Sequence, residues 1–188
     1  MYSVWGKRLL DIFFSIFLLI LLSPLFFLIS LLIYIFDSRP IFFKQERVGR
    51  QGSKFLIFKF RSMPVGASQI KTSEAYELRT TFIGKYIRRL YIDELPQLFN
   101  IIKGEMSIVG PRPILTNMDY MNNLREEKKI SFLRPGITGL AQLDSYDNMS
   151  EDAKINLEIK YMNNISLLYD FFLILRTFLY IFKKPTND

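Results

Sequence analysis

Two adjacent carboxylates, Asp93 and Glu94, stand at the start of a stretch in which apolar residues recur at helical spacing. The spacing predicts a helix over residues 91–104 that ends at Gly104. Asp93 is expected to cap this helix, with Pro96 in the first turn, where its missing N–H costs little. The carboxylates would then lie at the positive end of the helix, where unpaired backbone N–H groups can hold a phosphate.

The position of Asp93 is compatible with two roles. An ionised carboxylate can attack phosphorus and form an aspartyl phosphate without a separate base, and the field of the helix end is expected to keep Asp93 ionised. A plain capping aspartate followed by an exposed Glu94 explains the same residues and is the commoner case, because Asp is a frequent N-cap. The residues alone leave both interpretations open.

The 188-residue chain contains neither cysteine nor histidine. This excludes disulfides, thiolate nucleophiles, Ser-His and Cys-His mechanisms and most zinc sites, so any chemistry falls to carboxylates, Lys, Arg and Tyr. Lys and Arg outnumber Asp and Glu by 25 to 18, although 49% of the residues are hydrophobic. The length fits one compact domain with a membrane element, and the composition indicates a protein seated on an anionic surface.

Residues 9–36 form an almost wholly apolar stretch that is long enough to cross a bilayer. Pro24 lies near its middle and cannot donate a backbone hydrogen bond, so a helix break is expected at Ser23-Pro24, with the Ser23 hydroxyl bonded to a freed carbonyl. Cations flank both ends, which favours placing both on the cytoplasmic side. Residues 1–37 are therefore predicted to be a re-entrant membrane hairpin, with a simple span as the alternative. A cleavable signal peptide is disfavoured, because no small-residue cleavage site follows.

A β-hairpin is predicted directly after the membrane segment. Its strands are expected at residues 41–48 and 54–62, joined by a glycine-containing turn. Period-two spacing puts Lys59 and Arg61 on the face opposite to two phenylalanines. This cationic hairpin is expected to be a solvated edge that is attracted to lipid head groups.

Further elements complete a small, mostly helical α/β domain. Residues 65–80 are predicted to be a loop followed by a short helix, and residues 82–90 a helical turn that carries Arg88. Residues 165–182 are aromatic and aliphatic, with Asp170 interrupting them, and predict an interfacial amphipathic helix. A core helix of the domain would show the same periodicity and stays the alternative.

Three motifs follow one another in a fixed order, and further matching residues precede them. The motifs are Phe58-Lys59-Phe60-Arg61-Ser62-Met63, then Asp93-Glu94-Leu95-Pro96-Gln97-Leu98 through Gly110-Pro111-Arg112-Pro113, and then Arg134-Pro135-Gly136-Ile137-Thr138-Gly139. With Lys7-Arg8, Asp11 and Ser23-Pro24, the chain resembles the bacterial sugar transferase family, the monotopic polyprenol-phosphate phosphoglycosyl transferases, over nearly its whole length.

The resemblance implies a helix-break-helix membrane anchor over residues 1–37 and a catalytic phosphoglycosyl transferase domain over residues 38–188. The domain would lie on the cytoplasmic face of the bacterial inner membrane, with its active site at the lipid surface. The implied reaction is ping-pong: Asp93 attacks the sugar-bearing phosphate of a UDP-sugar, UMP leaves, and undecaprenyl phosphate then takes the phospho-sugar. This reaction is the first membrane step of glycoconjugate assembly.

The resemblance also assigns roles to single residues. Asp93 and Glu94 are implied as the catalytic carboxylates and as ligands for Mg²⁺, because magnesium on a diphosphate needs only one or two protein carboxylates. The implied phosphate or nucleotide contacts are Lys59, Arg88, Arg112 and Arg134, and the implied membrane-anchor residues are Lys7, Arg8, Asp11, Ser23 and Pro24.

One later motif departs from the family. The chain reads Gly139-Leu140-Ala141-Gln142-Leu143-Asp144-Ser145-Tyr146 where the family often has Gly-Trp-Ala-Gln-Val-Asn-Gly-Arg, so no contact is carried over there. Phe99 and Glu105 replace a common Trp and a common Asp, and both keep the chemical type.

Two other functions remain open at this point. The first is a glycosyl transferase that moves the sugar alone and releases UDP. The second is a non-enzymatic, basic membrane scaffold that gathers lipid-linked intermediates or binds nucleic acid; no recognisable nucleic-acid motif supports the latter.

Overall fold

The computed structural model describes residues 2–66, 80–144 and 149–183, and most of them are helical. The helices are η1 (Tyr2–Gly6), α1 (Lys7–Leu21), α2 (Ser23–Leu32), η2 (Ile33–Asp37), η3 (Arg50–Gly52), α3 (Phe82–Arg89), η6 (Ile92–Glu94), α4 (Gln97–Lys103), α5 (Asp119–Glu127), η7 (Ile130–Phe132), α6 (Leu140–Leu143), α7 (Glu151–Asn163) and α8 (Leu167–Lys183). The strands are β1 (Phe42–Val48), β2 (Lys54–Phe60), β3 (Ser107–Val109) and β4 (Gly136–Thr138). The predicted loop and short helix at 65–80 fall largely outside the described residues.

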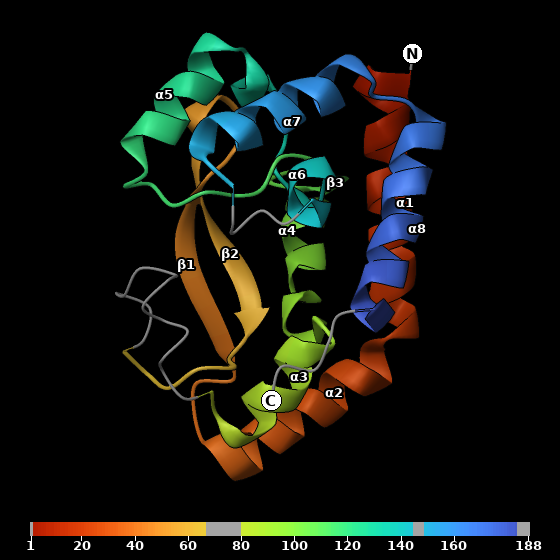
Figure 1. Ribbon diagram of the computed structural model, residues 1–188. Helices are drawn as coiled ribbons and strands as arrows, with labels where there is room; N and C mark the ends of the chain where they lie inside the picture. The colour runs from red at the N-terminus through yellow and green to blue at the C-terminus, as the bar shows by residue number, and fades with distance from the viewer. Residues whose placement is uncertain (1, 67–79, 145–148, 184–188) are drawn as a thin grey trace.

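The predicted β-hairpin is confirmed. β1 and β2 pair antiparallel, with a register that runs from Phe42 opposite Phe60 to Val48 opposite Lys54. A short parallel pair, β3 and β4, forms separately. Figure 1 shows the hairpin on one side of the molecule, α1 and α8 on the other, and α4 between them. The sheets are small, and helices therefore provide most of the framework.

The helix break predicted at Ser23-Pro24 is also confirmed. α1 ends at Leu21 and α2 begins at Ser23, and the two helical segments are bent by 60°. The Ser23 hydroxyl donates to the Ile20 carbonyl at 2.8 Å, as expected for a carbonyl left free by proline. No single helix among the described residues is long and apolar enough to cross a membrane, whereas this bent pair is when taken together.

α2 and η2 run below α3 and the lower end of the hairpin (Figure 1). Ile29 and Ile33 are buried in a cluster with Phe60 of β2 and with Ile83 and Ile87 of α3. Burial of such side chains contributes about 1.5–3 kcal/mol each. The second half of the broken helix is thereby fixed against β2 and α3, two of the elements that carry candidate site residues.

The other faces of the broken helix and of α8 are apolar and exposed. Phe13 on α1 and Phe27 on α2 are 63% and 72% exposed, and Leu168 on α8 is 81% exposed. α8 also contributes Leu173, which is fully buried, to a core cluster. The helix thus combines the two arrangements considered from the sequence, with one face in the core and an aromatic face exposed. Contiguous apolar surface of this kind marks an interaction site.

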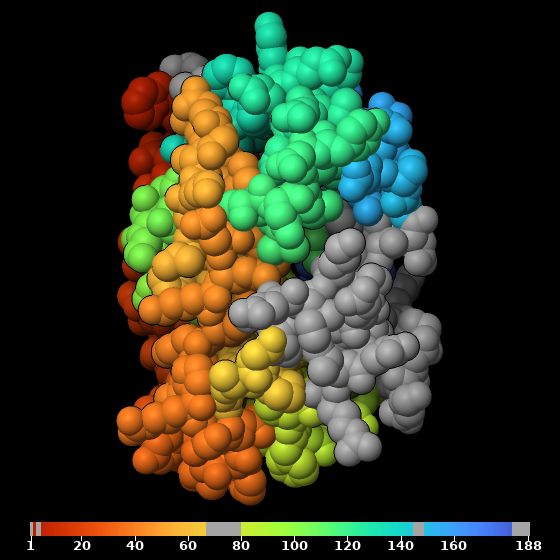
Figure 2. All heavy atoms as spheres, turned by 90° about the vertical axis from the view of Figure 1, so that its left-hand side faces the viewer, coloured from red at the N-terminus to blue at the C-terminus, as the bar shows by residue number. Residues whose placement is uncertain are grey.

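The cationic hairpin differs in part from its prediction. Arg61 is only 4% exposed, and its guanidinium donates to the backbone carbonyls of Asp37, Ser38 and Arg39. Arg61 therefore binds the backbone at the end of η2 and just after it. Its side chain cannot form part of a solvated edge. At the other end of the hairpin, Arg50 donates to the Phe132 carbonyl at 2.9 Å. Figure 2 shows the α5 segment lying against the hairpin at this end.

Candidate active site

Asp93 and Glu94 lie in a tight turn that precedes α4. The turn η6 spans Ile92–Glu94, and α4 begins only at Gln97, with Pro96 as its N-cap. The prediction that Asp93 caps a helix over 91–104 is therefore wrong, although Gly104 ends α4 in the left-handed region (φ 91°) as expected. Proline lacks the N–H that would continue the helical hydrogen bonds, so the turn closes with shorter-range ones.

The expected anion site at the helix start is not supported either. The N–H groups of Glu94 and Leu95 donate to the carbonyls of Tyr91 and Ile92. Those of Leu98 and Phe99 donate to Leu95 and Pro96. These four donors are already bonded and are not available to a phosphate beside Asp93.

The Asp93 carboxyl is almost fully buried, with 8% of the residue exposed. Burial raises the pKa of Asp93 to about 6, although the positive charges of Lys59 and Arg88 act to lower it. The helix field was expected to keep Asp93 ionised, but burial has the largest effect on its pKa and raises it. Asp93 is still largely ionised above pH 7, and a poorly solvated carboxylate is a stronger nucleophile than a hydrated one.

Glu94 is held by specific partners. Lys59 of β2 donates to its carboxylate at 2.5 Å, and the Gln97 side chain hydrogen-bonds to it. Burial acts to raise the pKa of Glu94, but Lys59 and the Arg112 guanidinium outweigh burial and hold this pKa below its ordinary value. The two neighbouring carboxylates therefore have opposite pKa shifts, and Glu94 stays ionised where Asp93 begins to titrate.

Three cations from three separate elements surround the carboxylates. Lys59 comes from β2, Arg88 from the last turn of α3, and Arg112 from the segment that follows β3. Lys59 and Arg88 act on Asp93, whereas Lys59 and Arg112 act on Glu94. Five of the predicted site residues thus come together at one place. A buried carboxylate with ammonium and guanidinium groups close enough to affect its pKa suits a phosphate substrate.

Arg134 lies elsewhere. Its Nε donates to the Gly104 carbonyl at 2.9 Å, at the end of α4 remote from Asp93. Arg8 of α1 donates there too, to the carbonyls of Ile101 at 2.7 Å and Ile102 at 3.2 Å. Cations at a helix C-terminus satisfy its last carbonyls and its negative dipole. The structure therefore does not bring Arg134 to the carboxylates; it fixes the far end of the helix that follows them.

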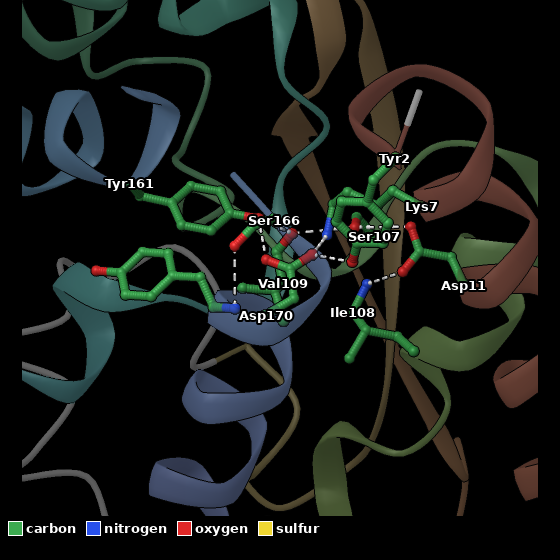
Figure 3. Close-up of polar contacts among 10 residues, drawn as sticks. Tyr2, Lys7, Asp11, Ser107, Ile108, Val109, Tyr161, Ser166 and Asp170 are labelled. Carbon is green, nitrogen blue, oxygen red and sulfur yellow. Dashed lines mark hydrogen bonds and ion pairs between the residues drawn. The ribbon is translucent and has the colours of Figure 1, made fainter. Parts of the chain in front are cut away.

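The predicted anchor residues of α1 also bind inside the protein. Lys7 forms an ion pair with Asp170 of α8 at 2.6 Å, with side chains only 15% and 5% exposed. Asp11 accepts hydrogen bonds from the Ser107 hydroxyl at 2.8 Å and the Ile108 N–H at 3.1 Å, and Figure 3 shows both sets of contacts meeting around β3. The first helix is thereby tied to α8 and to the strand that leads to Arg112.

Two buried amides were missed at the sequence level. Gln97 is 1% exposed and bonds Glu94, and Asn100 is fully buried. Asn100 accepts from the Phe58 N–H at 3.0 Å and donates to the Leu56 carbonyl at 2.7 Å, which locks α4 against β2 beside Lys59. The sequence offered one signal for these buried amides: they lie three residues apart among the apolar residues of a predicted helix.

Comparison with known proteins adds a family. The chain matches the family model described as "Bacterial sugar transferase" over residues 2–184. It is 39% identical over 165 residues, 87% of this chain, to "Uncharacterized sugar transferase EpsL" of Bacillus subtilis, and covers 81% of that protein.

Two longer relatives are similar over most of this chain. The "UDP-glucose:undecaprenyl-phosphate glucose-1-phosphate transferase" of Klebsiella pneumoniae is 35% identical over 96% of this chain. The "UDP-N-acetylgalactosamine-undecaprenyl-phosphate N-acetylgalactosaminephosphotransferase" of Aeromonas hydrophila is 36% identical over 91%. The chain spans only 40% and 42% of the lengths of these two proteins.

Proposed function

The chain belongs to the bacterial sugar transferase family, and we propose that it transfers a sugar-1-phosphate from a UDP-sugar to undecaprenyl phosphate and releases UMP. The observation that carries this proposal is the place of Asp93, a nearly buried carboxylate with Lys59 and Arg88 close enough to lower its pKa. The relatives named for such phosphotransferases support the same reaction class.

The chemistry proceeds in two displacements at one phosphorus atom. An oxygen of the Asp93 carboxylate attacks the phosphorus that bears the sugar, and the bond from this phosphorus to the bridging oxygen breaks. UMP leaves with that oxygen, and the sugar phosphate stays on Asp93 as an acyl phosphate. A phosphate oxygen of undecaprenyl phosphate then attacks the same phosphorus, which releases Asp93 and forms the lipid diphosphate sugar. Neither step needs a general base, because both nucleophiles are anions.

The cations supply the electrostatic stabilisation that this reaction needs. Negative charge spreads over the equatorial oxygens of the transferred group, and preorganised positive groups stabilise that charge. Arg88 is proposed to contact the phosphoryl group on Asp93, and Arg112 to contact the diphosphate from the side of Glu94. Lys59 holds Glu94 and lowers the pKa of Asp93, so it keeps both carboxylates ionised.

The pair Asp93 and Glu94 also fits a magnesium site. Among residues 2–66, 80–144 and 149–183, no group of three or more Asp and Glu gathers to hold a metal. Mg²⁺ bound to a diphosphate requires only one or two protein carboxylates, which this pair can provide. When bound, Mg²⁺ would neutralise negative charge on the diphosphate of the donor.

The pKa of Asp93 predicts the pH dependence of the donor half-reaction. Only the ionised carboxylate attacks, so kcat/KM for the UDP-sugar should fall as the pH decreases through about 6. Lys59 lowers this pKa, so Lys59→Met should move the acid limb to higher pH, whereas Lys44→Met on the neighbouring strand should leave it in place. UMP release without acceptor is the assay of choice, because the acceptor monoester itself titrates near pH 6. A pH-independent rate between pH 5 and 8 would contradict the assignment.

We further place the broken helix in the membrane as a re-entrant hairpin, with the domain on the cytoplasmic face of the bacterial inner membrane. The exposed apolar faces of α1, α2 and α8 support this placement, because they would be buried in lipid. A helix bent by 60° at a proline, with its freed carbonyl satisfied by Ser23, is compatible with lipid surroundings.

Cysteine labelling tests this topology, since the chain has no cysteine of its own. Trp5→Cys, at a position 77% exposed, reports the start of the hairpin, and Glu127→Cys on α5 reports the domain. An impermeant thiol reagent should label neither in intact cells and both in inverted vesicles. Labelling of position 5 alone in intact cells would show a simple span.

The nucleotide product tests the proposed reaction. Purified protein in detergent is incubated with Mg²⁺, undecaprenyl phosphate and UDP-glucose, UDP-galactose or UDP-N-acetylgalactosamine. UMP is expected with at least one donor. Release of UDP would instead identify a glycosyl transferase, and no release with any UDP-sugar would favour a non-enzymatic scaffold.

A further inference from the structure

Arg112 follows a short strand, and helix α7 contacts the backbone before it, at Val109, and at Arg112 itself. Residues 110–113 connect β3 to the chain that returns toward the hairpin, and they contain the Arg112 guanidinium that acts on Glu94. Two side chains of α7, Glu158 and Tyr161, reach this connection. They are three residues apart and thus lie on one helical face.

Tyr161 holds the end of β3. It is 2% exposed, and its hydroxyl lies 3.2 Å from the Val109 carbonyl and 2.8 Å from the Asp170 carboxylate. Figure 3 shows the ring of Tyr161 pointing toward these two groups. Because Asp170 also pairs with Lys7, the residue before Gly110 is linked to α7, α8 and α1 at once.

Glu158 holds the backbone at Arg112 itself. Its carboxylate accepts the Arg112 backbone N–H. Glu158 is 2% exposed and is bound at both oxygens by Arg125 of α5, with Nε at 2.8 Å from one of them. A bidentate guanidinium fixes the orientation of a carboxylate, so Arg125 sets the direction in which Glu158 presents its acceptor.

The remaining backbone contacts confine residues 110–113 from the opposite side. The Gly110 N–H donates to the Thr138 carbonyl at 2.9 Å, and the Gly136 N–H donates to the Pro111 carbonyl at 2.8 Å. A Cβ atom at Gly136 would lie 2.1 Å from the Gly110 nitrogen, so only glycine allows this approach. The segment is therefore clamped between β4 and α7. Charged side chains contact it from α7 through Glu158 and from β1 through Arg47, which donates to the Pro113 carbonyl at 3.3 Å.

We propose that the buried Arg125–Glu158 pair is a positioning element for the transfer reaction, which orients Arg112 toward the diphosphate by holding its backbone N–H. A buried ion pair is weak evidence for stability, because well-packed apolar residues often replace one without loss. A role in positioning Arg112 accounts for a buried ion pair at this place. This inference rests on the proposed function, because the effect is expected on phosphoglycosyl transfer.

The test replaces both partners with an unbranched apolar residue, as Arg125→Met/Glu158→Met. This paired variant leaves no uncompensated buried charge, and its Tm in detergent should stay near that of the wild type. Its kcat/KM for UMP release should fall about 10²-fold, since misplacement of a contact by about 1 Å has an effect of that size. The same change made in an Arg112→Ala background should have almost no further effect on kcat/KM.

Two results would overturn the proposal. One is wild-type kcat/KM in the paired variant; the other is an equal loss in the Arg112→Ala background, which would indicate a general structural effect. The matched control removes a partly exposed ion pair, Arg176 with Asp144, as Arg176→Leu/Asp144→Asn, and should change kcat/KM less than about 2-fold. If the paired variant does not fold, Glu158→Asp, which keeps the charge but shortens the side chain, takes its place with the same criteria. Absence of UMP release by the wild type would count against the proposed function, whereas the ratio of variant to wild type decides on the positioning role.

Discussion

Asp93→Asn should abolish UMP release, with kcat lower by about four orders of magnitude or more. Asparagine has nearly the shape of the carboxylic acid but cannot attack phosphorus, so loss of the nucleophile removes the whole covalent route. The measurement is UMP release from the active UDP-sugar with Mg²⁺ and undecaprenyl phosphate in detergent. Release by the variant at the wild-type rate would remove Asp93 as the nucleophile.

The stability of the same variant separates lost chemistry from lost folding. Burial raises the pKa of Asp93 to about 6, so its charged form destabilises the folded state. The destabilisation is absent below the ordinary value of 3.8, where Asp93 is protonated in both states, and it is complete above pH 6. At pH 8 the free energy of unfolding of Asp93→Asn should therefore exceed that of the wild type by up to about 3 kcal/mol, and its Tm should be higher. The difference should shrink as the pH falls from 6 toward 4.

Arg88→Ala should lower kcat/KM about 10²- to 10³-fold, the usual effect of removing one transition-state donor. Arg88 is near enough to Asp93 to lower its pKa, and it is proposed to contact the phosphoryl group that Asp93 receives. Arg89→Ala is the matched control, because Arg89 is the next residue of the same helix and is exposed like Arg88. Its kcat/KM should stay within about 2-fold of the wild type.

The pair of variants also separates local from long-range electrostatics. Both remove one positive charge from the last turn of α3. An equal loss in both would mean that the net charge of the surface attracts the anionic donor, and Arg88 would then have no specific contact. A loss confined to Arg88→Ala, and insensitive to added salt, supports direct contact.

The local features of the fold could be predicted from the sequence. The hairpin could be predicted because apolar and polar residues alternate on either side of a glycine-containing turn. β1 and β2 follow that pattern. The break between α1 and α2 could be predicted because proline lacks the backbone N–H that the helix needs. The end of α4 at Gly104 could be predicted because glycine adopts the left-handed conformation that ends a helix.

Tertiary contacts decided what the sequence could not show. Lys7 pairs with Asp170, 163 residues away, and no local spacing announces this contact. The cap expected at Asp93 was displaced because Pro96 favours a separate tight turn before α4. The pKa of Asp93 depends on burial beneath elements distant in sequence, so neither its direction nor its size follows from the residue's neighbours.

Arg134 illustrates a related limit of motif reading. It belongs to a motif that matches the family, yet its guanidinium bonds the Gly104 carbonyl at the end of α4. A motif identifies residues that the fold or the site requires. Only the structure separates the residues near the two carboxylates from residues that hold the surrounding helices in place. Glu158 and Arg125 show the converse, because both lie outside every quoted motif, yet Glu158 accepts the Arg112 backbone N–H and Arg125 binds Glu158.

The most direct measurement is a single turnover with the UDP-sugar and Mg²⁺ in the absence of undecaprenyl phosphate. The proposed mechanism predicts a burst of UMP that approaches one per active enzyme, and a peptide containing Asp93 whose mass is increased by one sugar phosphate. Added acceptor should discharge that peptide. If no UMP forms until undecaprenyl phosphate is added, the sugar phosphate passes directly from donor to acceptor, and the covalent role of Asp93 is contradicted.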